Sequence, residues 1–340
     1  MPEIIGEFAD RLVTTELRNR AMNHNIIPQI YDRARAALGG RPLSTLAAEG
    51  LHQRVQPGDV VFIVTGAGYP PEMPHGESDG PPGAAVLARA LYWGMKAVPV
   101  FLTEALHAPP VVASSEAAGV TVRDFDLAKG RGLGAALVCP PPDPADYHRW
   151  IGETFERYQP KAIVSTERLG PNEKGITHYS TGVTHKDIVN FGPIFDEARR
   201  RGVFSIGIGD NGNEIGFGLI HGFMRDFHPY GRDCPCGCGG GVPTVVATDV
   251  LFPVSISNWG CYAVAATLAF LLRDIDVFHT PELERRIVMS CLEAGGYEAR
   301  YCTKRFIVDG AEGETSMAVV QILRDMVRLN LAPPDRGPAH

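Results

Sequence analysis

Short, wholly apolar runs that alternate with helical patterns constrain the fold of this 340-residue chain more than any other feature. Six runs are apolar enough to be buried strands, and helical periodicity separates most of them. The predicted strands are residues 60–65, 98–102, 120–125, 162–166, 203–209 and 244–247. The helices predicted between them are residues 84–95, 145–158, 188–200 and 215–225. This alternation predicts an α/β fold, with right-handed crossovers and a mostly parallel sheet covered by helices on both faces.

Both ends of the chain have helical patterns without strands. Residues 1–56 form an N-terminal helical segment, with helices predicted over 7–23 and 27–38. C-terminal helices are predicted over 261–272, 281–293 and 315–329, and Thr280 followed by Pro281 is a good helix start. No stretch has the composition of a flexible linker, so residues 1–340 are predicted to form a single domain whose tail, 331–340, is frayed.

Composition and charge exclude several classes of function. The formal net charge of −7 argues against a general nucleic-acid surface. No apolar run approaches the length of a membrane-spanning helix, and the first residues lack the basic region of a secretory signal. Seven cysteines are an odd number, which fits free thiols in a reducing cytoplasm. We therefore expect a cytoplasmic protein with a small-molecule ligand, no nucleic-acid or membrane partner, and room for homo-oligomers.

A loop rich in proline and glycine, residues 66–85, follows the first predicted strand, which ends at Thr65. Such a loop is conformationally restricted, and open α/β sheets bind ligands where a strand feeds a helix in this way. One interpretation is that Asp79 caps the following helix. The other is that Gly80 and the free N–H groups after it hold a substrate carboxylate or phosphate while Glu77 and Asp79 act as acid–base groups or Glu77 binds a metal.

A second polar loop, GDNGNEIG at 209–216, follows another apolar strand. It holds Asp210, Asn211, Asn213 and Glu214 within five positions. A tight turn with Asn213 as a helix cap would explain part of this. Two acids and two amides exceed what a turn needs, so they predict either oxygen ligands for a divalent cation or a grip on an ammonium group with Asp210 or Glu214 as general base.

Two further loops add candidate substrate-binding groups. Glu167 and Arg168 follow the strand at 162–166. Arg168 suits a bidentate contact to a substrate carboxylate, and an exposed ion pair with a neighbouring acid is the alternative. In VSISNWG at 254–260, Ser257 is a natural helix cap, and Ser257 and Asn258 are also predicted to line the cleft.

The run CPCGCGGG places Cys234, Cys236 and Cys238 at alternate positions. In an extended backbone three thiols with this spacing share one face and could bind zinc or another soft metal. Structural zinc sites mostly use wider spacings and a distant second pair, and Cys261 is the only plausible fourth thiol nearby in the sequence. Free thiols beside glycines are the alternative, so the sequence leaves the need for a metal open.

Four segments in order resemble the D-glutamate cyclase C-terminal-domain family. They are TGAGYPPEMPHGESDGPPGAAVLARAL, STERLGP, FSIGIGDNGNEIGFG and SISNWGCYAVAATL, and a counterpart of the closing VDG lies at 308–310. The CPCGCGGG run is not part of the pattern. The resemblance implies an α/β domain that interconverts D-glutamate and 5-oxo-D-proline with loss or gain of water, or acts on a related amino acid or lactam.

Closing the five-membered ring requires a base for the ammonium group, polarisation of the γ-carboxyl group and an acid for the departing hydroxide. The predicted catalytic residues are Glu77, Asp79, Asp210 and Glu214. The predicted substrate-binding residues are Thr65, Gly80, Glu167, Arg168, Asn211, Asn213, Ser257 and Asn258. The metal-ligand candidates are Asp210 with Glu214, or the three thiols of the CPCGCGGG run. A metal-dependent hydrolase or lyase of another small amide and a non-catalytic amino-acid-binding module remain as alternatives.

Overall fold

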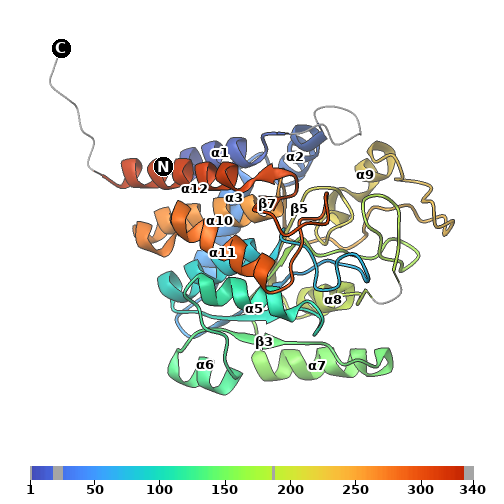
Figure 1. Cartoon of the computed structure of the whole chain (residues 1–340), viewed down its shortest axis with the longest axis horizontal. Coiled ribbons are helices and arrows are strands. Elements are labelled where there is room, and N and C mark those ends of the chain that lie inside the picture. Colours follow the sequence, from blue (N-terminus) through green and yellow to red (C-terminus); the bar gives the residue numbers. More distant parts are fainter. Residues whose placement is uncertain (1, 18–25, 186–187, 333–340) are drawn as a thin grey trace, which may run out of the picture.

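A six-stranded parallel sheet forms the centre of the molecule (Figure 1). The structure is a computed structural model, and it describes residues 2–17, 26–185 and 188–332. The strands are β1 Val60–Val64, β2 Val98–Leu102, β3 Ala136–Val138, β4 Ala162–Thr166, β5 Phe204–Gly209 and β6 Val250–Pro253. Their order is β3-β2-β1-β4-β5-β6, and every neighbouring pair is parallel. The order reverses between β1 and β4, and open α/β sheets bind ligands at the carboxyl ends of strands at such a point.

Helices cover both faces of the sheet (Figure 1). They are α1 Pro2–Val13, α2 Ile26–Ala37, α3 Leu43–Arg54, α4 Pro81–Arg89, α5 Ala108–Ala117, α6 Phe125–Arg131, α7 Tyr147–Tyr158, α8 Gly192–Arg200, α9 His221–Phe227, α10 Ser257–Leu272, α11 Pro281–Glu293 and α12 Gly313–Leu331. A π-helical turn, Ala90–Gly94, continues α4, and short 3₁₀ turns lie at Pro144–Asp146, Gly218–Ile220 and Ile275–Val277. A small hairpin pairs β7 Ile307–Val308 with β8 Ala311–Glu312.

Alternate residues of the central strands enter two separate hydrophobic cores. Val61 and Ile63 of β1 pack with α3, α4 and α10, while Phe62 and Val64 pack with α7 and α8. Since side chains alternate across a strand, a fully apolar strand must be covered on both sides. In Figure 1 the helices α6 and α7 lie at the bottom of the view, and α10 and α12 lie in its upper left part. The predicted α/β class, with its helical segments at both ends, is confirmed.

Four of the six predicted strands are confirmed, and two predictions at the edges of the sheet are wrong. Residues 120–125 make one isolated bridge, at Val122, before α6 begins at Phe125, and the edge strand is β3 instead. Residues 244–247 form a loop whose Val245 N–H bonds to the carbonyl oxygen of Pro171, and the strand is β6, three residues further on. Both runs contribute apolar side chains to the hydrophobic cores, while their backbone groups bond to loop residues rather than to a neighbouring strand.

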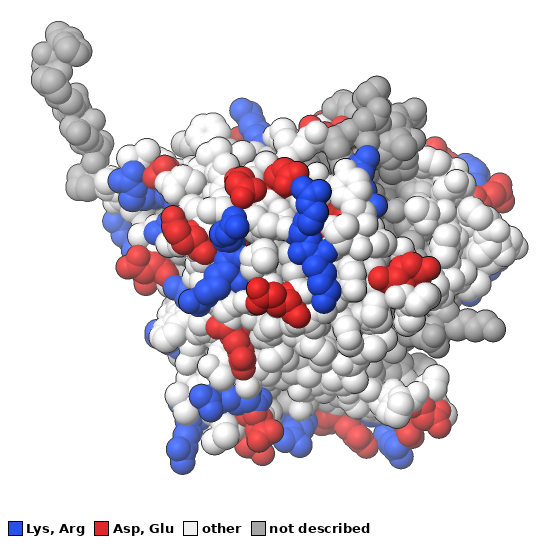
Figure 2. Space-filling view, in the orientation of Figure 1, with Lys and Arg blue, Asp and Glu red and all other residues white. Residues whose placement is uncertain are grey.

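Most predicted helices are confirmed within a few residues, but in the helix predicted over 215–225 a loop and a 3₁₀ turn come before α9, which begins at His221. The helix predicted over 7–23 ends at Val13, and residues 18–23 lie outside the described part of the chain, as does 333–340 of the predicted tail. Three helices, α3, α5 and α6, were not predicted from the sequence. No described helix is long and apolar enough to cross a membrane. Figure 2 shows basic and acidic side chains interspersed over the visible face.

Candidate active site

The three polar loops predicted from the sequence meet at one edge of the sheet. They follow β1, β4 and β5, which are neighbours and run in the same direction. Backbone hydrogen bonds fasten the second loop to the third: Gly170 N–H donates to Asn213 O at 2.8 Å, and Ile215 N–H donates to Arg168 O at 2.8 Å. The three loops therefore converge at the carboxyl ends of neighbouring strands.

Three buried carboxyl groups lie together where β4 and β5 end. Glu167, Asp210 and Glu214 each place a carboxyl oxygen within 4.8 Å of the other two. Burial, followed by the charge of Asp210, raises the pKa of Glu214 to about 8 and holds the pKa of Glu167 well above its usual range. Like charges this close cannot all be ionised in a poorly solvated site, so the cluster retains protons at neutral pH unless a cation replaces them.

Glu77 faces the same cluster from the loop after β1. Its backbone is fixed because Glu77 N–H donates to Ala67 O at 2.8 Å and its neighbour Ser78 N–H donates to Tyr297 O at 2.7 Å. Its side chain is partly exposed, and its carboxyl group has no hydrogen-bond partner among the described residues. Burial, then the charges of Asp79 and Asp309, raise the pKa of Glu77 well above its usual range. A carboxyl group with these properties is suited to exchange protons with a ligand.

Asp79 and Asn258 cap each other's helices. The Asp79 carboxylate accepts from Ser257 N–H at 2.9 Å and Asn258 N–H at 2.8 Å, the first two residues of α10. In return Asn258 Oδ1 accepts from Gly80 N–H at 2.9 Å and Gly83 N–H at 2.7 Å at the start of α4. The exchange satisfies N-terminal N–H groups of both helices with side chains distant in sequence.

This exchange corrects two predictions. Asp79 caps α10 as well as bonding to its own neighbour Gly80, whereas the sequence suggested a cap on the helix that follows it. The start of α4 offers no free N–H group to an anion, because Gly80 and Gly83 donate to Asn258 and the two residues between them are prolines. Burial and the charge of Asp210 still raise the pKa of Asp79 to about 7, so it contributes to the electrostatics of the site.

Several polar groups around the acids remain available to a ligand. The Thr65 hydroxyl and the Asn213 side-chain oxygen are buried without a hydrogen-bond partner in the described chain. Asn213 is oriented by its Nδ2, which donates to His178 O at 2.9 Å. Because unsatisfied buried polar atoms are costly, these two mark where a polar ligand would bind. Ser257, in contrast, donates from Oγ to Glu167 Oε2 at 2.5 Å, and Asn211 Nδ2 donates to Asp210.

Arg168 is engaged inside the protein rather than presented to a ligand. Its guanidinium makes a bidentate ion pair with Glu104, with distances of 2.6 and 2.5 Å, and donates to the carbonyl oxygens of Gly66 and Val189 at 2.6 Å each. It also stacks over the Phe191 ring at 4.4 Å and is only 1% exposed. The structure thus shows neither the predicted carboxylate clamp nor the exposed ion pair, because Glu104 holds the guanidinium in the interior.

Glu104 was not found from the sequence. It follows β2 in a loop without a marked polar pattern, and it is 64 residues from Arg168. Burial would raise the pKa of Glu104, but the charge of Arg168 and hydrogen bonds from His107 and Arg168 hold it at about 2. The Glu104–Arg168 pair therefore connects the loops that follow β1, β2 and β4.

A cluster of three rings, Tyr69, Tyr179 and His185, lies beside the acids and was not predicted from the sequence. Tyr69 packs edge-on against Tyr179, with ring centroids 4.8 Å apart, and stacks on His185 at 5.0 Å. Tyr179 donates from its hydroxyl to Gly68 O at 2.6 Å. Burial, followed by the charge of Glu77, raises the pKa of Tyr179, because this ring lies near that carboxyl group. The paired segments at 66–69 and 179–185 thus form a wall of the site.

The three thiols of the CPCGCGGG run lie close to one another and to an imidazole ring. His178, Cys234, Cys236 and Cys238 each place a ligand atom within 4.8 Å of the others, a geometry compatible with a metal ion. The fourth member is His178, and Cys261 is fully buried within α10 instead. His178 could not be assigned to this cluster from the sequence, because it precedes Cys236 by 58 residues.

The comparisons with known proteins agree with this architecture. A family model described as D-glutamate cyclase-like, C-terminal, matches residues 10–324, which is most of the chain. Among curated proteins, human mitochondrial D-glutamate cyclase is 27% identical over 223 residues, covering 62% of this chain and 33% of the human protein. The matched region thus spans about a third of that relative.

Proposed function

The chain belongs to the D-glutamate cyclase-like C-terminal family, and from this premise we propose that it is a hydro-lyase that interconverts D-glutamate and 5-oxo-D-proline plus water. The observation that carries the proposal is the set of buried carboxyl groups at the switch point of the sheet, whose shared charge keeps protonated and ionised members side by side. Ring closure needs both forms at once, because the ammonium nitrogen loses two protons to acceptors as the C–N bond forms, and the oxygen that departs as water gains two protons from donors.

Glu77 and Asp210 are the residues to which we assign the proton transfers. Glu77 is partly exposed, has a raised pKa and faces the cluster, so in its protonated form it can supply the proton that the departing hydroxide needs. Asp210 lies beside Glu214 and Glu167, and as a carboxylate it can take a proton from the substrate ammonium group. Glu214, whose carboxyl group accepts from Gly212 N–H at 2.8 Å, holds its loop and shares the charge.

Substrate binding is assigned to two groups that have no hydrogen-bond partner among the described residues. The Asn213 side-chain oxygen is an acceptor for the ammonium group, and the Thr65 hydroxyl can bond a carboxyl oxygen. A protonated carboxylic acid of the cluster can also donate to a substrate carboxylate, which reduces the repulsion between a dianionic substrate and an acidic site. Arg168 acts as a positioning residue that holds three loops of the site together.

A mass measurement tests the reaction directly. The purified chain is incubated separately with D-glutamate, L-glutamate and the two enantiomers of 5-oxoproline, and the products are read by mass spectrometry as loss or gain of one water. We expect conversion with the D-enantiomers. If D-glutamate binds but no product forms over a long incubation, the proposed enzymatic activity is wrong and the protein is a non-catalytic amino-acid-binding module.

Two variants test the assigned roles. Glu77→Gln and Asp210→Asn keep the shape of each side chain and remove its acid–base function, so each should lower turnover by at least ~10²-fold. Glu72→Gln is the matched control, because Glu72 lies in the same loop but is exposed. Unchanged turnover in both site variants would remove these residues from the mechanism.

A divalent cation at Glu167, Asp210 and Glu214 is the second candidate, favoured by the short distances between their oxygens. In that case the protein would be a metal-dependent hydrolase or lyase of a related small amide, with the cation polarising the carbonyl group. Chelation followed by separate addition of Mg²⁺, Mn²⁺ or Zn²⁺ tests it. Activity that depends on Mg²⁺ or Mn²⁺ supports this candidate, and activity retained after chelation excludes it.

The remaining expectations from the sequence belong to the same proposal. We infer that the ligand is a small amino acid or lactam, and that nucleic acids and membranes are not partners. The interspersed charges on the face in Figure 2 support the first exclusion, since nucleic-acid binding needs a continuous basic surface. A cytoplasmic location and a homo-oligomer stay predictions, which fractionation of cells and light scattering of the purified chain would test.

A further inference from the structure

Four soft donor atoms converge beside the acid site, on side chains to which the proposed reaction assigns no role. Cys234 Sγ lies 3.0 Å from Cys236 Sγ and 3.2 Å from Cys238 Sγ. The imidazole Nε2 of His178 lies 3.1 Å from Cys236 Sγ and 3.9 Å from Cys238 Sγ. Zn–S bonds near 2.3 Å and tetrahedral angles put sulfur ligands about 3.8 Å apart, so a zinc ion would fit after movements of less than about 1 Å.

The backbone of the CPCGCGGG run brings the thiols together through turns rather than an extended strand. Gly237 N–H donates to Cys234 O at 3.0 Å, which closes a turn around Pro235 and Cys236. Gly237 and Gly239 then adopt left-handed conformations, with φ of 74° and 71°, which side chains would disfavour. Glycines at these positions let the backbone turn sharply, so that the thiols of cysteines two residues apart lie close together. The unusual spacing is thus explained by local geometry.

Hydrogen bonds hold His178 and Cys238 in orientations that suit metal binding. His178 directs Nδ1 at Ile176 O, 3.2 Å away, and a proton on Nδ1 leaves the Nε2 lone pair facing the thiols. Cys238 Sγ accepts from Asn172 Nδ2 at 3.3 Å and from Gly240 N–H at 3.4 Å. Hydrogen bonds of this kind orient thiolate and imidazole ligands and stabilise their metal-binding forms.

We propose that His178, Cys234, Cys236 and Cys238 bind a structural zinc ion. Three thiolates and one imidazole fill a tetrahedral site completely, so no position remains for water or substrate, as in structural rather than catalytic zinc sites. The ion would fasten the loop after β4 to the loop after α9. His178 O accepts from Asn213 Nδ2 at 2.9 Å, so the metal would also hold the Asn213 side chain of the candidate active site.

Metal content of the full-length protein, purified under reducing conditions from zinc-supplemented cells, tests the proposal. We expect about one zinc per chain by elemental analysis. His178→Asn and Cys234→Ser should each retain less than about a tenth of that zinc, because a closed site loses most of its affinity with one ligand. Cys139→Ser is the matched control, since Cys139 is a thiol outside the cluster, and it should keep the full zinc content.

If those variants fail to fold, a second measurement on the wild-type protein tests the zinc site. Zinc in the wild-type protein is replaced by Co²⁺, and we expect thiolate-to-cobalt charge-transfer absorption together with the visible bands of a tetrahedral ion. Chelation should increase amide hydrogen exchange in residues 172–182 and lower the thermal midpoint, with helical circular dichroism retained. Wild-type protein without zinc, a Cys234–Cys236 disulfide, or bound iron with inorganic sulfide would each overturn the proposal.

Discussion

Arg168, buried and paired with Glu104, links several loops of the candidate site from inside the protein. Its guanidinium bonds to groups after β1 and β2 and before α8, while its own backbone follows β4. The neighbouring Glu167 has a left-handed backbone, with φ of 47°, which costs roughly 1 kcal/mol for a side-chain-bearing residue. Strain of this kind clusters at functional sites, where the surrounding contacts sustain it.

We therefore expect Arg168 variants to change stability more than substrate binding. Glu104→Gln leaves the buried guanidinium charge without its partner and should lower the free energy of unfolding by about 3–5 kcal/mol. Replacing both residues, as in Arg168→Met with Glu104→Leu, should recover much of that loss because no buried charge is left unpaired. Urea unfolding of the single and double variants measures both effects. An Arg168→Lys protein with normal stability and a strongly raised KM would instead restore the carboxylate clamp predicted from the sequence.

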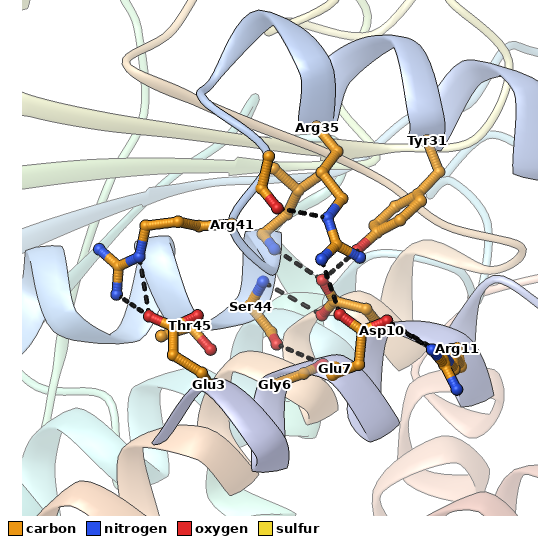
Figure 3. A network of polar contacts seen from close by, with 12 residues as sticks. Glu3, Gly6, Glu7, Asp10, Arg11, Tyr31, Arg35, Arg41, Ser44 and Thr45 are labelled. Carbon is orange, nitrogen blue, oxygen red and sulfur yellow. Dashed lines mark hydrogen bonds and ion pairs between the residues drawn. The ribbon is translucent and has the colours of Figure 1, made fainter. Parts of the chain in front are cut away.

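At the scale of secondary-structure elements, several helices are capped by side chains from distant parts of the chain. The residue before α3 is Pro42, which has no side-chain cap to offer. Asp10 of α1 supplies it instead, accepting from Leu43 N–H at 2.6 Å and Ser44 N–H at 3.1 Å (Figure 3). Tyr31 of α2 donates to the same carboxyl group at 2.6 Å. One buried carboxyl group thus joins the first three helices.

The Asp10 carboxyl group should make stability depend on pH. Burial raises the pKa of Asp10 to about 6, against about 3.9 in an unfolded chain, although hydrogen bonds from Ser44, Tyr31 and Leu43 act to lower it. Between these values the folded state binds more protons, so the free energy of unfolding falls as pH rises, by up to about 3 kcal/mol. Asp10→Asn lacks this titration. Its deficit relative to wild type, measured by urea unfolding, should therefore shrink between about pH 4.5 and about pH 7.

A deficit that grows with pH would show that the three donors around Asp10 stabilise its ionised form. Asp32→Asn provides the control, because Asp32 lies on α2 but is exposed. Its difference from wild type should stay small and nearly constant over the same pH range.

These distant caps explain which helices could be predicted from the sequence and which could not. α11 was predicted with its observed bounds because Thr280 and Pro281 carry a local start signal. α3 was missed because its cap comes from Asp10. β3 and β6 were misplaced because edge strands are short and nearby apolar loop residues give the same pattern.

The same distinction holds for the site residues. Loops rich in acids and amides at strand ends could be found by local composition, and parallel strands place such loops at one edge of the sheet. The partners that decide the role of each residue could not be found in this way. Asp79 binds to α10, Arg168 to Glu104 and the thiols lie next to His178, and each of these contacts joins segments far apart in sequence.

At the scale of the whole molecule, the buried acids of the site lower the free energy of unfolding at neutral pH. Burial and mutual repulsion raise the pKa of Glu77 and Glu167, and bring those of Asp79 and Glu214 to about 7 and 8. An unfolded chain ionises these groups near pH 4. Because the folded state holds the protons longer, its free energy of unfolding falls as pH rises from about 4 to about 8. Two packed cores and a six-stranded sheet must offset this cost.

Asp210→Asn should therefore make the protein more stable and less active. Asp210 raises the pKa of all four other acids of the site, so its neutralisation lets them ionise with less repulsion. One pKa unit at one carboxyl group corresponds to about 1.4 kcal/mol, so a gain of at least that size is expected near pH 8 and little gain near pH 4. Urea unfolding at both values measures it, and Asn211→Asp, which adds a charge beside the cluster, should shift stability in the opposite direction. If Asp210→Asn is instead less stable near pH 8, and a chelator abolishes the difference, a bound cation rather than shared protons neutralises the acids.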